Sequence, residues 1–184
     1  MAITQVGTTT WYYGRGYNAY DYTGLNRIAI TKPTGVQVGD LLIFSIHANS
    51  GGSYGFTEQN PYESVICQTP FTYVTRRNTT QGFVEVYYRI AGPYEPSTYY
   101  FKADTVYNYH NHFLTAFRGC DPDSPIGNTS ASISTSSTTS HTVPGLTVQT
   151  TGNALIYCGT EMARPLVITP PTGFTALANH DDNI

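Results

Sequence analysis

The sequence predicts an all-β fold, built as a single antiparallel β-sandwich. Gly, Pro, Ser, Thr and Asn interrupt the chain about every ten residues, and β-branched and aromatic residues fill the stretches between them. Few stretches show a helical period. The frame Ile-Thr-x-Pro-Thr-Gly occurs at 30–35 and again at 168–173, each time after an apolar stretch. Because proline cannot donate to a sheet ladder and glycine permits a positive φ, both copies predict a strand that stops and turns.

The strands themselves follow from the hydrophobic pattern. Residues 40–48 form the strongest apolar run, apolar on both faces at first, which is typical of a central strand. Residues 97–102 follow a turn and are predicted as a hairpin partner of 83–90. Residues 128–142 predict an exposed edge strand, and 153–160 a buried strand. Two ranges alternate between two faces: Val84, Val86, Tyr88 and Ile90 opposite Phe83, Glu85, Tyr87 and Arg89, and Phe113, Thr115 and Phe117 opposite His112, Leu114, Ala116 and Arg118.

Length and composition indicate one domain with a sizeable core. The chain has 184 residues, of which 40% are hydrophobic. We expect a Tyr/Gly-rich N-terminal arm over 1–26 and the sandwich over 27–184. Only 11% of residues are charged, the net charge is −3, and the lysines are Lys32 and Lys102. A chain without a basic face does not favour nucleic acid as a partner.

The cysteines and the first residues bear on the compartment. Cys67, Cys120 and Cys158 are odd in number and widely spaced, so they predict neither a disulfide framework nor a metal site. Buried free thiols are the preferred interpretation for Cys67 and Cys158, which lie in apolar runs. The start of the chain carries no secretion signal pattern, and no apolar run reaches membrane-spanning length. We therefore expect folding in a reducing cytosol and no membrane insertion.

Several short motifs occur in an order that resembles a known family. The motifs are Gly39-Asp40-Leu41-Leu42, Tyr87-Tyr88-Arg89-Ile90, Phe117-Arg118-Gly119 followed by Pro125-Ile126, Asn153-Ala154-Leu155-Ile156, and Pro170-Pro171-Thr172-Gly173-Phe174. The resemblance is to a β-sandwich module of bacteriophage virion appendage proteins, such as tail fibres and surface adhesins, that also occurs in some bacterial surface proteins. It covers roughly residues 28–177.

The resemblance implies a structural virion protein that acts by binding. The expected location is the surface of a phage particle, after synthesis in the host cytoplasm. The implied partners are other virion proteins and further copies of the chain, with a trimer favoured. Capsid decoration or a head fibre is the alternative. The family usually continues with two more strands after the last motif, whereas this chain ends at Ile184, which predicts a sandwich that is incomplete at its C-terminus. Either the sequence is a fragment, or a neighbouring copy completes the sandwich by strand addition. Jelly-roll and immunoglobulin-like topologies both stay open.

The N-terminal segment supplies the candidate binding residues. Tyrosine combines a large, rigid area with a hydroxyl group, which suits protein interfaces and sugar stacking. The segment could dock on a neighbouring subunit, bind a host-surface glycan, or cover the sandwich of its own chain. A carbohydrate-binding module is therefore the alternative function from another class. The candidate residues are Trp11, Tyr12, Tyr13, Tyr17, Tyr20 and Tyr22.

No constellation predicts catalysis, a cofactor or a metal. His110 and His112 would share one face of a strand, and a solvated histidine pair at a sheet edge is the preferred interpretation. The acidic turns at 121–123 and 181–183 could bind Ca²⁺, but Asx-type turns are preferred. Asp40, which follows a glycine, is predicted to stabilise the turn that enters the central strand. We therefore expect a protein that is not an enzyme.

Overall fold

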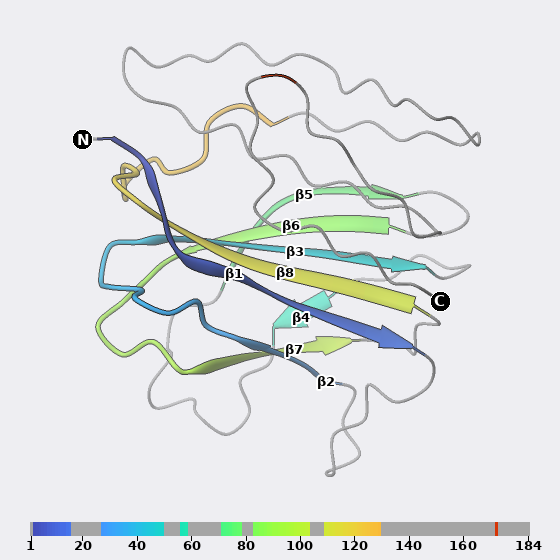
Figure 1. Ribbon diagram of the computed structural model, residues 1–184. Coiled ribbons are helices and arrows are strands. Elements are labelled where there is room, and N and C mark those ends of the chain that lie inside the picture. The colour runs from blue at the N-terminus through green and yellow to red at the C-terminus, as the bar shows by residue number, and fades with distance from the viewer. Residues whose placement is uncertain are drawn as a thin grey trace.

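The protein folds as a β-sandwich of two antiparallel sheets, as predicted (Figure 1). The strands are β1 (Thr4–Arg15), β2 (Arg27–Thr31), β3 (Leu41–Asn49), β4 (Phe56–Glu58), β5 (Thr72–Asn78), β6 (Phe83–Ile90), β7 (Thr98–Ala103) and β8 (Tyr109–Arg118). The larger sheet has the order β1-β8-β3-β6-β5 and the smaller one the order β2-β7-β4. The computed structural model describes residues 2–15, 27–49, 56–58, 71–78, 83–103, 109–129 and 172, and no helix occurs among them.

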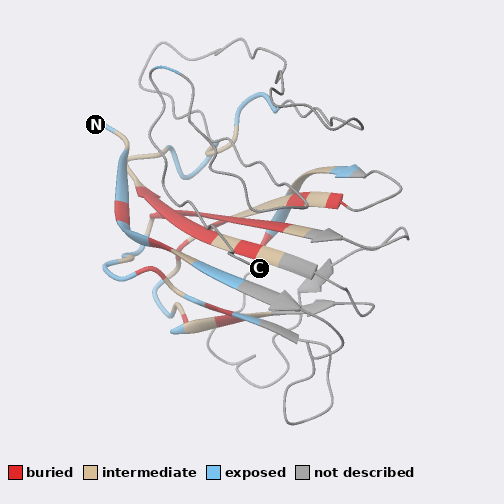
Figure 2. Ribbon diagram, turned by 45° about the vertical axis from the view of Figure 1, so that its right-hand side comes forward, coloured by how far each residue is buried: buried red, intermediate tan, exposed pale blue. Residues whose placement is uncertain are grey.

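The centre of the larger sheet is β3, which the apolar run at 40–48 predicted. It pairs with β6 on one side and with β8 on the other. Figure 2 shows the buried residues following β3 and β8 through the sandwich. The core between the sheets joins apolar side chains of both: Val6, Ile30, Leu42, Phe44, Ile46, Phe71, Phe83, Ala91, Tyr99, Leu114 and Ala116.

The alternation along β6 is confirmed, and the face that carries the charges is the inner one. Phe83, Glu85 and Arg89 are buried, while the residues between them are only partly buried. Val86, Tyr88 and Ile90 pack on the opposite face of the sheet, against a second cluster around Leu41, Ile43 and Phe117. Both faces of the central strands are thus covered, and two charged side chains lie inside the sandwich.

The predicted hairpin between 83–90 and 97–102 is wrong. Strand β6 lies between β3 and β5, so neither of its edges is open to a further strand. Strand β7 instead pairs with β2 and β4 in the smaller sheet. The turn after β6 therefore carries the chain from one sheet to the other, which a pattern of strands and turns does not reveal.

Asp40 joins three strands at one end of the larger sheet. Its buried carboxylate accepts hydrogen bonds from Gln37 N (2.7 Å) and, at both oxygens, from the Arg118 guanidinium (2.9 and 2.8 Å). Its carbonyl accepts from Ala91 N at 2.8 Å, and Gly39 N donates to Ala91 O at 2.9 Å. The predicted role of Asp40 at this turn is confirmed by the Gln37 contact, and the hydrogen bond to Asp40 raises the pKa of Arg118.

Two motif glycines are needed for their backbone. Gly39 and Gly119 both have φ of 89°, a region that other residues rarely adopt. A Cβ at Gly119 would lie 2.6 Å from Ala2 O, so a side chain there would clash with the start of the chain. The first Ile-Thr-x-Pro-Thr-Gly frame also behaves as predicted, because β2 ends at Thr31 and the chain turns at Thr34 and Gly35.

The segment predicted as an N-terminal arm begins with a strand of the sandwich. Residues Thr4–Arg15 form β1, the edge strand that pairs with β8, with a register shift between Val6 and Thr10. Residues 16–26 lie outside the described residues, as do the predicted strand at 153–160 and the acidic turn at 181–183. The same holds for 130–142 of the predicted edge strand and for all of the second frame except Thr172.

Replacing Asp40 with alanine is expected to lower the free energy of unfolding by about 2 kcal/mol, because hydrogen bonds to a buried charged group are lost. Urea unfolding followed by circular dichroism measures the change. The matched control is Asp121→Ala, which removes an exposed carboxylate whose hydrogen bond within the described residues comes from the Asp123 amide at 3.0 Å. That control should change stability by less than about 0.5 kcal/mol. Equal stability of Asp40→Ala and wild type would contradict a structural role for Asp40.

Candidate functional site

The predicted aromatic residues that the structure describes lie on β1. Trp11 is 48% exposed and Tyr12 is 45% exposed. Trp11 pairs with Phe113 and Tyr12 with His112, so the two side chains emerge from opposite faces of the edge strand. Tyr13 belongs to the same strand, but the structure does not describe its side chain. Tyr17, Tyr20 and Tyr22 lie outside the described residues. The structure thus places three of the six candidates on β1 and gives the exposure of two of them, Trp11 and Tyr12.

His112 is not part of a solvated pair, and that prediction is wrong. His112 is fully buried, and its strand β8 lies between β1 and β3 instead of at an edge. Its ring stacks on Phe44 with centroids 6.2 Å apart and meets the Tyr12 ring at 5.7 Å. The error arose from taking 112–118 as an edge, whereas β1 covers that side of the strand.

A depression opens where two turns of the chain meet. One turn joins β2 to β3 and the other joins β6 to β7. The depression measures about 720 Å³ and is open to solvent. Tyr94 and Val38 are 71% and 66% exposed there. The complete lining is Lys32, Val36, Gln37, Val38, Gly92, Pro93, Tyr94 and Glu95.

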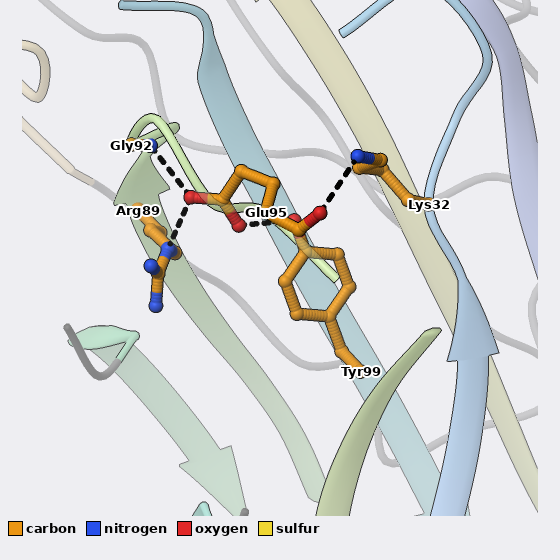
Figure 3. Close-up of polar contacts among 5 residues, drawn as sticks. All are labelled: Lys32, Arg89, Gly92, Glu95 and Tyr99. Atoms are coloured by element: carbon orange, nitrogen blue, oxygen red, sulfur yellow. Dashed lines mark hydrogen bonds and ion pairs between the residues drawn. The ribbon is translucent and has the colours of Figure 1, made fainter. Parts of the chain in front are cut away.

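Glu95 holds the β6–β7 turn in place from the inside. Its Oε1 accepts hydrogen bonds from Arg89 Nε at 3.0 Å and Gly92 N at 2.6 Å, and its Oε2 accepts from the Tyr99 hydroxyl at 2.6 Å. The side chains of Arg89 and Glu95 are only 3% and 4% exposed. Figure 3 shows these groups converging on the carboxylate. A buried carboxylate with three donors fixes the path of the turn that carries Tyr94.

Lys32 links the second turn to the first. Its ammonium group donates to the backbone carbonyl of Glu95 at 3.1 Å, and its own amide donates to Ser97 O at 2.9 Å (Figure 3). No carboxylate of the described residues forms an ion pair with Lys32. The Arg89 charge, in contrast, is neutralised by Glu95. The lining of the depression therefore carries one positive charge that no described carboxylate compensates.

A second buried carboxylate lies farther along β6. Glu85 accepts from Arg76 Nη1 at 2.8 Å and from the Tyr87 hydroxyl at 2.8 Å, and the Arg76 guanidinium lies 4.6 Å from the centroid of the Phe83 ring. Burial, and then the Glu85 charge, raise the pKa of Tyr87 far above its usual range, so the hydroxyl stays a donor. These two hydrogen bonds link residues of the paired strands β5 and β6, which indicates a structural cluster.

The remaining sequence candidates give no site among the described residues. No group of three or more His, Cys, Asp or Glu side chains lies close enough there to hold a metal ion. Asp121 forms the predicted Asx-type turn with the Asp123 amide. Cys120 is a free thiol whose pKa is raised by burial and then by Asp40. Within the same residues, no helix is long and apolar enough to cross a membrane.

The depression was missed because its residues belong to two turns some sixty positions apart. Both turns were recognised from their prolines and glycines, but nothing local says that they touch. One signal was available. Lysine is almost absent from the chain, and Lys32 lies inside a turn motif. A charged residue type that is rare in the chain and lies in a turn indicates a turn with a role beyond reversing the chain.

Replacing Glu95 with glutamine is expected to cost about 3 to 5 kcal/mol of unfolding free energy, because the Arg89 charge would stay buried without its partner. Chemical unfolding measures the cost. Tyr99→Phe is the control, since it removes one hydrogen bond to the same carboxylate and should cost about 1 kcal/mol. If Glu95→Gln proved no more destabilising than Tyr99→Phe, the carboxylate would not be the anchor of the turn.

Two places on the described surface carry candidate binding side chains. One is the aromatic pair Trp11 and Tyr12 on the edge strand β1, and the other is the depression with Tyr94 and Lys32. Aromatic rings, an ammonium group and a carboxamide are groups that bind partners and ligands. None of the protein-family models, curated proteins and solved structures that were compared with the chain matches it.

Proposed function

We propose that the chain is a structural virion protein of a bacteriophage, a tail-fibre or adhesin-like component of the particle surface that acts by binding and not by catalysis. The β-sandwich and the motif resemblance support this proposal. Two of the motifs meet in the structure, because Asp40 of Gly-Asp-Leu-Leu pairs with Arg118 of Phe-Arg-Gly. Asp40 and Arg118 therefore belong to the scaffold, and the exposed strand and turns are left for contacts with partners.

The observation that carries the proposal is the aromatic pair on β1. Trp11 and Tyr12 expose nearly half of their surface at the edge of the larger sheet. Large aromatic side chains are enriched at the energetic centres of protein interfaces, where their burial contributes most. An edge strand also presents backbone groups to which a neighbouring chain can add. Side chains on both faces of such a strand suit an interface that wraps around the sheet edge.

The partner proposed for this surface is a second copy of the chain, within a trimer. Fibres and other appendages gain reach and valency by assembling identical subunits, and closed rotational symmetry limits the assembly. Capsid decoration or a head fibre would use the same surface, since each also requires the sandwich to attach to a symmetric particle. A tail fibre, a capsid decoration and a head fibre differ in their position on the particle, and all three lie on its surface.

The test is the solution mass of the purified chain, measured by light scattering after size exclusion. The expected result is about three times the 20.2 kDa of one chain. Trp11→Ala should shift the mass toward that of one chain, because it removes a large ring from the proposed contact. The matched control is Tyr73→Ala, which removes an exposed ring from β5 at the opposite edge of the sheet. A wild-type monomer, or dissociation by both variants alike, would contradict self-assembly through β1.

A further inference from the structure

The depression between the β2–β3 and β6–β7 turns has the composition of a ligand site. Its rim carries a tyrosine ring that is 71% exposed and a valine that is 66% exposed. Its lining also includes Glu95, whose side chain is buried, and the polar residues Lys32 and Gln37. An apolar surface with a few fixed polar groups is typical of sites for small ligands or for single units of a polymer.

The tyrosine ring favours a flat, partly apolar ligand that also forms hydrogen bonds. A pyranose ring has such a shape, with C–H groups on its faces and hydroxyl groups around its rim. Tyr94 can offer its ring face to the sugar and its hydroxyl to the rim. The Gln37 carboxamide, which is exposed, supplies both a donor and an acceptor for hydroxyl groups.

The charge of the lining favours an acidic ligand. Arg89 and Glu95 neutralise each other in a buried pair. Lys32 uses one of its three N–H donors on the Glu95 carbonyl, and two remain. It has no carboxylate partner among the described residues, so its charge is not compensated there. As far as the described residues go, this ammonium group therefore favours an anion in the depression, on a chain whose net charge is −3.

Both walls of the depression are held in position before any ligand arrives. Glu95 fixes the β6–β7 turn through Arg89, Gly92 and Tyr99. The β2–β3 turn is tied to the same region, because Gly39 N donates to Ala91 O and Lys32 N donates to Ser97 O, both at 2.9 Å. Pre-organised walls reduce the entropy that binding must spend on ordering the site.

We infer that this depression binds an acidic glycan, with a carboxylated pyranose of the uronic-acid class stacked on Tyr94 and its carboxylate on the Lys32 ammonium. The inference rests on the binding role proposed above and gives it a ligand class. It places the glycan contact away from the aromatic pair on β1, which is assigned to contacts between subunits. One chain would thus assemble through its edge strand and bind sugar through its turns.

Affinity electrophoresis of the purified full chain tests the ligand class with four polymers. Polygalacturonate and alginate present uronic acids, dextran presents pyranose rings without charge, and polyphosphate presents charge without sugar. The expected result is retardation by at least one uronic-acid polymer, clearly exceeding that by dextran and by polyphosphate. Retardation by polyphosphate to the same extent would reduce the site to a non-specific electrostatic patch. No retardation by either uronic-acid polymer would overturn the inference.

Variants then locate the site. Tyr94→Ala, a substitution at an exposed position, should weaken retention about ten-fold, since the stacking surface is lost. Lys32→Gln should weaken binding to the uronic-acid polymer and make that binding less dependent on salt. Lys32→Arg keeps the positive charge, so it should retain both the affinity and the salt dependence. Tyr73→Ala is the matched control and should bind as wild type does. Thermal unfolding verifies that each variant is folded, and unchanged retention by folded Tyr94→Ala would also overturn the inference.

The two proposals fail in different ways. If the wild-type chain is a monomer but binds polygalacturonate through Tyr94, the self-assembly proposal fails and the glycan site stands. If the chain is a trimer that Trp11→Ala dissociates, yet neither uronic-acid polymer retards it, the glycan site fails alone. Trp11→Ala measured in both assays separates the contributions, because it should change the mass and leave the binding of one short oligogalacturonate per chain unchanged.

Discussion

The buried carboxylate of Asp40 is the point on which the larger sheet depends. A carboxylate out of contact with water needs donors, and here they come from the turn before β3 and from the end of β8. The backbone of the same residue bonds to Ala91 at the end of β6. The ends of three neighbouring strands are thus fixed at one site. Since a slip of one residue would turn every side chain to the wrong face, this fixed end sets which residues face the core.

The strands could be predicted from sequence wherever a continuous apolar run or a clear alternation of apolar and polar residues marks the strand. The apolar run of β3 and the alternation of β6 and β8 each correspond to a strand at the predicted place. Pattern alone does not tell which strands become neighbours. The hairpin of β6 with β7 was therefore predicted wrongly, and His112 was assigned to an edge that β1 covers. The pattern also did not predict which face of β6 points inward. Glu85 and Arg89 lie on the inner face, where each forms an ion pair with a residue outside β6.

The same distinction applies to the candidate site. The tyrosines of the N-terminal segment stand out in composition, so Trp11 and Tyr12 could be named as candidate residues for binding, and the structure shows that both are partly exposed on β1. The depression brings Lys32 together with Glu95, and only the crossing of the chain from one sheet to the other creates that contact. Long-range packing of this kind has no local signal. The sequence motifs mark the glycines and charges that make the crossing possible, and they do not mark the surface that results.

The anchoring of the β6–β7 turn by Glu95 has a consequence for how such a surface can evolve. The residue that fixes the backbone points inward, while the neighbouring Tyr94 points to solvent. The conformation of the turn therefore depends on one side chain, and the surface that it presents to solvent depends on another. Under the binding role proposed above, substitutions at the outward position would alter the recognising surface and keep the Glu95 anchor. Such a separation would favour a protein that has to follow a changing target surface.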